Sequence, residues 1–218
     1  MASWKIGQPE IPERLKADLE LQDATETAMD EDEDVYQRSF VQQTLFGIQT
    51  GTVDYKACRF ERCRFEEVEP GRISFVDCVF EKCELSNLRF EGVAMKRVRF
   101  VDCHLTGLTL EKAALTDVAF ENCMMDYLSI SESKLDRVRF ASCRMRESLW
   151  NDTKLGRLAF EQADMTQSEW SFTSLYQQDV TECRIEGIRI SLPDLRGVKV
   201  TSAQLVSLSG LLGVEVTD

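Results

Sequence analysis

The sequence has few of the residues that proteins most often use for catalysis. Its 218 residues include one histidine, His104, and no glycine-rich phosphate loop or Walker signature. His104 directly precedes an apolar position of the repeat described below, so we expect its side chain to point outward, where it cannot orient a catalytic triad. We therefore expect no enzymatic activity and no cofactor.

The sequence also lacks long apolar runs and an excess of basic charge. No stretch approaches the 18 consecutive apolar residues of a membrane-spanning helix, so we expect no membrane contact. Residues 1–5 lead into Pro9 and charged residues rather than into the apolar core of a signal peptide, which favours a cytoplasmic location. With 26 basic and 38 acidic residues the formal net charge is −12, so direct binding of nucleic acid is not expected.

The acidic charge is concentrated near the N-terminus. Residues 1–40 contain eleven acidic and four basic residues, a net charge of −7, and the other 178 residues carry −5. Ile11, Leu15 and Leu19 recur at every fourth position, with Pro12 near the start, which predicts one short amphipathic helix. We interpret residues 1–36 as an acidic N-terminal arm or cap.

Apolar residues recur at every fifth position through most of the chain. From Phe75 to Leu195, all 25 positions divisible by five are apolar, which at an apolar frequency of 43% has a chance of about 10⁻⁹. Residues five apart in a helix are rotated by about 140°, and an odd step along a flat strand reverses the side chain, so neither element buries this row. The chain must therefore turn a corner every five residues.

A longer period of twenty residues indicates how many corners complete one coil. Phenylalanine recurs at this spacing from Phe40 to Phe160, and cysteine recurs at it from Cys63 to Cys143. Four five-residue segments per coil predict an all-β, four-sided solenoid in which identical residues stack. Residues 37–200 would form about eight such coils, a rod about 38 Å long at strand spacing.

Two segments resemble the consensus of the pentapeptide repeat family, Ala163-Asp164-Met165 and Pro193-Asp194-Leu195-Arg196-Gly197. The chain is similar to this family in its spacing over residues 40–197, although arginine replaces the usual Asp or Asn at Arg59, Arg64, Arg99 and Arg139. The resemblance implies a right-handed quadrilateral β-helix.

All eight cysteines lie on the row two residues before the central apolar residues. A zinc site, a disulfide framework and small core residues are the alternative interpretations. Cys58/Cys63 and Cys78/Cys83 have a spacing that zinc sites use, but the coil would place them on adjacent faces of a packed core. We expect core packing and no metal.

The last residues, 201–218, are expected to close the end of the solenoid. Thr201 and Gln204 form a capping box, which predicts a helix that ends at Gly213 and is followed by a short strand. Its apolar surface exceeds what one small end needs, and family members of this kind often dimerise there. We therefore predict a homodimer with an interface formed by Leu205, Val206, Leu208, Leu212, Val214 and Val216.

The outward positions leave two functions open. A partial acidic stripe follows the phenylalanine column and consists of Glu61, Glu81, Asp102, Glu121 and Glu161. The chain resembles the fluoroquinolone-resistance proteins of the Qnr and MfpA type, which implies that the stripe could mimic DNA phosphates towards DNA gyrase or topoisomerase IV. The alternative is a non-catalytic interaction scaffold, which basic stripes such as Arg59, Arg99 and Arg139 favour because they can pair with the acids.

Overall fold

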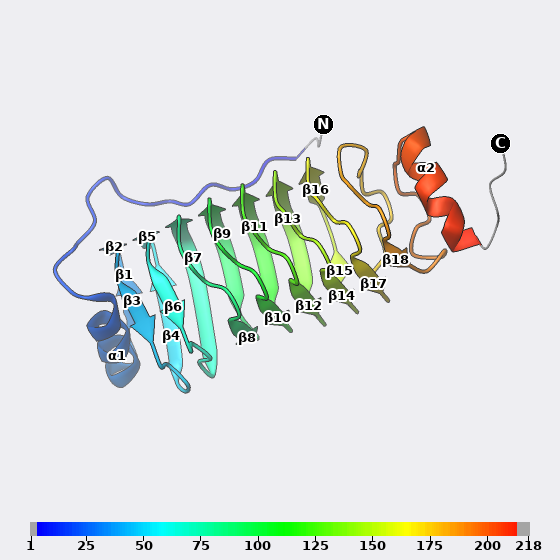
Figure 1. The fold of residues 1–218 in the computed structure, drawn as a ribbon. Coiled ribbons are helices and arrows are strands. Elements are labelled where there is room, and N and C mark those ends of the chain that lie inside the picture. Colours follow the sequence, from blue (N-terminus) through cyan, green and yellow to red (C-terminus); the bar gives the residue numbers. More distant parts are fainter. Residues whose placement is uncertain (1–3, 213–218) are drawn as a thin grey trace.

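The twenty-residue period of the sequence becomes the length of one coil in the structure. The computed structural model describes residues 4–212. Every pairing between strands is parallel and joins residues twenty apart, as Phe120 does with Phe100 and Phe140. The coils stack in register into a rod (Figure 1). This confirms the predicted fold class, an all-β solenoid of about eight coils.

The strands are short because each one crosses a single face of the rod or turns one corner. The ten-stranded sheet contains β1 (Asp34–Tyr36), β2 (Ser39–Val41), β4 (Thr52–Lys56), β5 (Arg59–Glu61), β7 (Arg72–Glu81), β9 (Ala94–Val101), β11 (Ala114–Glu121), β13 (Lys134–Ala141), β15 (Lys154–Leu155) and β16 (Leu158–Glu161). The six-stranded sheet contains β8 (Arg89–Glu91), β10 (Thr109–Glu111), β12 (Ser129–Ser131), β14 (Leu149–Asn151), β17 (Glu169–Ser171) and β18 (Arg189–Ile190). The remaining face contains β3 (Thr44–Phe46), β6 (Arg64–Glu66) and single bridges that continue through Glu84, His104, Met124, Arg144, Asp164 and Arg184.

The corners are made by residues in the left-handed backbone conformation. Within residues 4–212, twenty-four non-glycine residues have positive φ, and all of them carry numbers that end in 2 or 7. All except Asp32, which caps α1, lie two residues after a central apolar residue. Each such residue costs roughly 1–2 kcal/mol relative to an ordinary backbone conformation. The stacked coils therefore impose this conformation, since residues such as Tyr127 and Phe172 do not favour it on their own.

The centre of the rod is filled by stacked aromatic rings. Phe40, Phe60, Phe80, Phe100, Phe120, Phe140 and Phe160 form one column with ring centroids 4.5–5.4 Å apart. Trp150 and Trp170 stack on another face with centroids 4.5 Å apart. All of these rings are buried, which confirms the core that the five-residue period predicted.

The cysteines satisfy backbone carbonyl groups at the corners. The Cys63 thiol donates to the carbonyl of Phe40 at 3.3 Å, and the Cys103 thiol donates to the carbonyl of Phe80 at 3.5 Å. The Thr153 hydroxyl donates to the carbonyl of Ile130 in the same relation, 23 residues back along the chain. Where the row carries cysteine or threonine, the side chain therefore fills the core and also donates one hydrogen bond within it.

The N-terminal end is closed by a helix, but not by the one that the sequence predicted. The prediction of a helix around Ile11–Leu19 is wrong, because that segment is extended. The helix that the structure contains, α1, spans Leu21–Glu31. Its buried face lies against the first coils, where the Thr25 and Tyr55 hydroxyls are 2.7 Å apart. The side-chain oxygen of Gln43 accepts the N–H of Leu21 and so caps the helix from outside.

The C-terminal end is closed by α2 (Ser202–Leu208) and a 3₁₀ turn (Ser209–Leu212). The predicted capping box between Thr201 and Gln204 is confirmed. The Gln204 amide also donates to the carbonyls of Val180 and Cys183 and so ties the helix to the last coils. Within residues 4–212, no helix has both the length and the apolar character needed to cross a membrane.

We predict that Phe120→Ala lowers the free energy of unfolding by about 3–5 kcal/mol, because it leaves a cavity in the middle of the ring stack. Urea denaturation followed by circular dichroism measures this change. The matched control is Leu149→Ala on the exposed surface, for which we expect a change within about 0.5 kcal/mol. Equal stability of the two variants would contradict the role of the stack.

Candidate functional site

The acidic stripe predicted from the sequence lies along one edge of the rod. Glu61 and Glu81 are register partners on adjacent coils. Farther along the same edge, Glu121 and Glu161 lie on either side of Ala141. Asp102 lies one residue beyond the edge, at a corner with φ of 54°. The structure thus aligns the carboxylates along an edge about 24 Å long, with Asp102 just beside it.

Arginines on the neighbouring column pair with most of these carboxylates. The pairs between coils are Arg59–Glu81, Arg99–Glu121, Arg139–Glu121 and Arg139–Glu161, with N–O distances of 3.7, 3.0, 2.5 and 3.9 Å. Glu61 pairs with its neighbour Arg62 at 2.9 Å. Five carboxylates over five coil spacings give about one negative charge per 5 Å even before this pairing, whereas duplex DNA carries about one per 1.7 Å.

A second column of charged residues lies at the corner of the rod beside this edge, at residues with positive φ. Arg137 makes two hydrogen bonds to the Asp117 carboxylate, at 2.6 and 2.7 Å, and Arg97 makes the same contact with Asp77, at 2.5 Å for each bond. From Asp77 to Arg137 the charge of this column alternates from coil to coil. The hydrogen bond from Arg137 lowers the pKa of the Asp117 carboxyl, which remains ionised in the folded protein.

An extended N-terminal segment lies along the outside of these coils. We call residues 4–16 the strap (Figure 1). The N–H of Gly7 donates to Asp117 Oδ1 and the N–H of Glu10 donates to Asp77 Oδ1, each at 2.9 Å. The strap then joins the first coil through Lys16, which exchanges backbone hydrogen bonds with Gln37 and Ser39.

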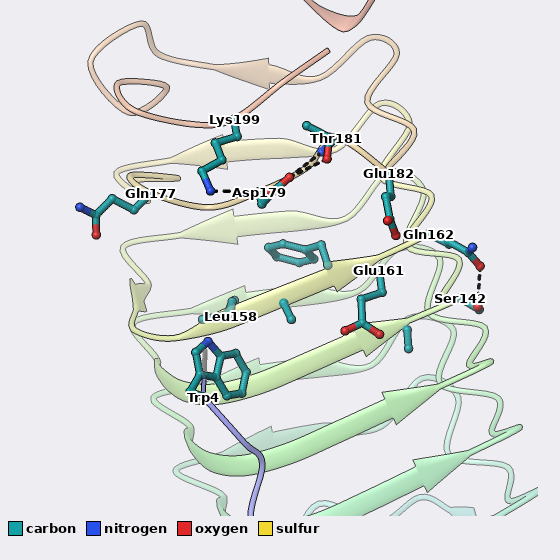
Figure 2. A pocket seen from close by; sticks show the side chains of 13 residues that line it. Trp4, Ser142, Leu158, Glu161, Gln162, Gln177, Asp179, Thr181, Glu182 and Lys199 are labelled. Atoms are coloured by element: carbon teal, nitrogen blue, oxygen red, sulfur yellow. Dashed lines mark hydrogen bonds and ion pairs between the residues drawn. The ribbon is translucent and has the colours of Figure 1, made fainter. Parts of the chain in front are cut away.

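The strap ends in a hollow near the C-terminal end of the rod. This hollow of about 760 Å³ is bordered by Trp4, Leu158, Ala159, Asp179 and Lys199, among others. Figure 2 shows the Trp4 ring beside Leu158, with Asp179 and Lys199 on the coils beyond. The Asp179 and Lys199 side chains form an ion pair at 3.7 Å. One wall of the hollow is therefore apolar and the other is charged.

The residues of the predicted dimer interface have different surroundings. Leu205 and Val206 are 59% and 61% exposed on the outer side of α2, whereas Leu208 is 7% exposed and packs against the core. Leu212 ends the 3₁₀ turn. Val214 and Val216 lie outside the described residues. Among the interface residues whose burial the structure describes, Leu205 and Val206 are thus the exposed ones.

All eight cysteines are buried and none forms a disulfide. Burial raises the pKa of the Cys183 thiol to about 11, so this thiol is protonated at neutral pH. Within residues 4–212, no group of three or more His, Cys, Asp or Glu residues is arranged to hold a metal ion. The stacked thiols are therefore part of the core packing and its hydrogen bonds.

The strap is the element that the sequence interpretation missed. Four of its half-buried apolar residues are spaced by three, at Ile6, Pro9, Pro12 and Leu15, whereas Trp4 and Ile11 depart from this spacing. A period of three with two prolines is typical of an extended polyproline-type segment rather than of a helix. This spacing was the available signal, and the four-residue spacing from Ile11 to Leu19 obscured it.

Comparison with known proteins agrees with the repeat. Residues 93–170 match the family model described as pentapeptide repeat region, which confirms the family resemblance inferred from spacing. No curated protein matches the chain.

Among solved structures, a trypsin-treated form of QnrB1, described as a plasmid-mediated fluoroquinolone resistance protein, is 15% identical and covers 84% of this chain and 88% of its own, with a TM-score of 0.41. Full-length QnrB1 is 15% identical with coverage of 81% and 97% and a TM-score of 0.32. HetL, a pentapeptide repeat protein involved in heterocyst differentiation regulation from the cyanobacterium Nostoc, is 10% identical with coverage of 76% and 82% and a TM-score of 0.28.

We predict that Asp117→Asn destabilises the protein at about pH 7 by roughly 1–3 kcal/mol, because it weakens the bonds to Arg137. The Asp117 pKa is lowered on folding, so its contribution is present above the unfolded value of about 3.9 and disappears as the pH falls through the folded pKa. Urea denaturation at about pH 7 and about pH 2 measures this difference.

The matched control is Asp152→Asn, which lies at an equivalent left-handed corner and is exposed. We expect its effect to stay within about 0.5 kcal/mol at both pH values. A deficit in Asp117→Asn that persists unchanged at the lower pH would contradict the ion-pair explanation.

Proposed function

We propose that this chain, which belongs to the pentapeptide repeat family, is a non-catalytic rod that acts by binding other proteins. The observation that carries the proposal is a group of exposed apolar side chains towards the C-terminal end; within residues 4–212, four other large ones lie between residues 19 and 46 and two lie on the middle coils. Five large apolar side chains between residues 172 and 206 are 48–82% exposed: Phe172, Tyr176, Leu192, Leu205 and Val206. Exposed apolar groups concentrated in one region of a polar surface are typical of protein interaction sites.

The same end supports pairing of two copies of the chain. At the N-terminal end, α1 buries Leu21, Ala24 and Ala28 against the coils. At the C-terminal end, α2 buries Leu208 and leaves Leu205 and Val206 exposed. Two rods joined through α2 would be about 80 Å long, at a strand spacing of about 4.8 Å.

We expect the intact protein to sediment as a dimer and the double variant Leu205→Glu/Val206→Glu to sediment as a monomer, because two carboxylates would be buried at the interface without partners. Sedimentation velocity at micromolar concentration measures this change. Ser207→Glu, on the same helix and also exposed, is the control that should remain dimeric. A wild-type monomer at about 100 μM would exclude stable end-to-end pairing, because the dissociation constant of any dimer would then exceed about 100 μM.

A narrower form of this function is DNA mimicry towards DNA gyrase or topoisomerase IV, with protection against fluoroquinolones. The net charge of −12 and the alignment of the acidic stripe support it. The ion pairs with Arg99 and Arg139 count against it, since they reduce the field that a basic groove would attract. We therefore place general protein binding first and mimicry second.

If the rod is a DNA mimic, micromolar protein should inhibit gyrase supercoiling and reduce drug-stabilised cleavage, and added salt should weaken both effects. The triple variant Glu61→Gln/Glu81→Gln/Glu161→Gln should lose most of this inhibition. The control with the same charge change outside the stripe is Glu26→Gln/Glu31→Gln/Glu33→Gln. Equal inhibition by both triple variants, or none by the wild type, would remove the mimicry proposal.

A further inference from the structure

The strap and the coils beneath it have matching periods. Gly7 and Glu10 are three residues apart, and the carboxylates that accept their N–H groups, Asp117 and Asp77, are two coils apart. Three residues of a polyproline-type chain advance about 9.3 Å, and two coils at strand spacing advance about 9.6 Å. The mismatch is about 0.3 Å per repeat, so an extended chain can stay in phase with the rod over several coils.

The outward surface under the strap has the same two-coil period. One outward position per coil forms a column, and small residues alternate with arginines along it: Ser39, Arg59, Val79, Arg99, Ala119, Arg139 and Ala159. Val79 and Ala119 are 7% and 1% exposed although their strand positions point out of the coil. The small residues thus form shallow depressions between the arginine side chains, and we call these depressions the notches. We call the whole column the track.

The strap meets the track with its apolar residues and the solvent with its charged ones. Ile6, Pro9, Pro12 and Leu15 are half-buried, whereas Lys5, Gln8, Glu13 and Arg14 are exposed. Ile11, Pro12 and Leu15 border the same recess as Ser39 and Arg59. The apolar residues of the strap therefore face the rod. Three residues match two coils between Gly7 and Glu10, whereas the six residues from Glu10 to Lys16 also cover about two coils.

We propose that the track is a binding site for an extended, proline-containing segment of a partner protein with an apolar residue at every third position, and that the strap is its resident occupant. This inference rests on the proposed role in protein binding and names the surface and the class of partner. Recognition through the backbone N–H groups at Gly7 and Glu10 does not depend on their side chains, so another segment of the same shape satisfies Asp117 and Asp77 equally well.

The strap can be exchanged without opening the core. The inward residues beneath it, including Phe80, Phe100 and Phe120, are packed by their own coils, with ring-to-ring distances of 4.7 and 4.9 Å. Residues 17–20, which join the strap to α1, are all exposed. Beyond Trp4 the column continues through Asp179 and Lys199 at the edge of the hollow, so a longer segment has further surface to contact.

The experiment uses the full chain with a protease site inserted after Ala17, where the linker is exposed. A fluorescein-labelled peptide with the sequence of residues 4–16 is titrated into the cut and uncut proteins, and fluorescence polarisation is measured. The attached strap competes at an effective concentration on the order of millimolar, so the cut protein should bind the peptide at least about tenfold more tightly. A cut strap that is retained through gel filtration must be displaced by the peptide during the titration for the proposal to stand.

Two comparisons test the period and the anchors. A peptide of the same composition in which Ile6 exchanges places with Gly7 and Pro9 with Gln8 keeps an N–H group at both anchor positions but loses the three-residue spacing. It should bind at least about tenfold more weakly, a loss of about 1.4 kcal/mol, because its apolar residues no longer meet the notches. Asp117→Ala in the cut protein should weaken binding, whereas Asp164→Ala should not. Asp164 is a similarly covered aspartate, paired with Arg146 on another face.

If the cut protein fails to stay folded, uncut Ile6→Asp/Pro9→Asp weakens the attached strap and serves in its place. A freed track that binds no peptide, or that binds the out-of-phase peptide equally well, would overturn the inference. Neither result bears on the C-terminal pairing or on gyrase, which are measured separately.

Discussion

The in-register parallel ladder, which joins each residue to the one twenty positions later, is the constraint on which the rest of the structure depends. Because this offset is the same on every face, residues twenty positions apart stack in one column, and each side chain must pack against those of the neighbouring coils. The phenylalanine column and the Trp150–Trp170 pair satisfy this requirement with stacked rings. The same requirement places a left-handed residue at nearly every corner, whether or not its side chain favours that conformation.

Register also governs the charges on the surface. Like charges stacked about 4.8 Å apart would repel by about 3 kcal/mol at an effective dielectric constant of 20, so an unbroken column of one sign is costly. The chain alternates Asp77, Arg97, Asp117 and Arg137 on one column. On the neighbouring column it separates its arginines with Val79 and Ala119. Both columns therefore repeat every two coils. Three residues of an extended segment span about the same length, so such a segment can follow either column.

The two ends of the rod are covered by different elements, so the N-terminal and C-terminal ends present different surfaces. At the N-terminal end, α1 buries its apolar face, and the strap then doubles back along the coils (Figure 1). At the C-terminal end, α2 is tied down by Gln204 yet leaves Leu205 and Val206 exposed. Solenoids must cover both ends to avoid open-ended stacking, and an end that remains apolar is suited to pairing with a second copy.

The sequence alone determined the coil, the core columns, the role of the cysteines and the capping box of Thr201 and Gln204, because these depend on short-range spacing that repeats many times. It also aligned the acidic residues from Glu61 to Glu161. Tertiary structure decided their pairing with Arg99 and Arg139, since ion pairs between coils depend on the separation of neighbouring columns. It also decided that Ile11 and Leu15 lie in an extended strap, because a short segment with two prolines takes its conformation from the surface that it packs against.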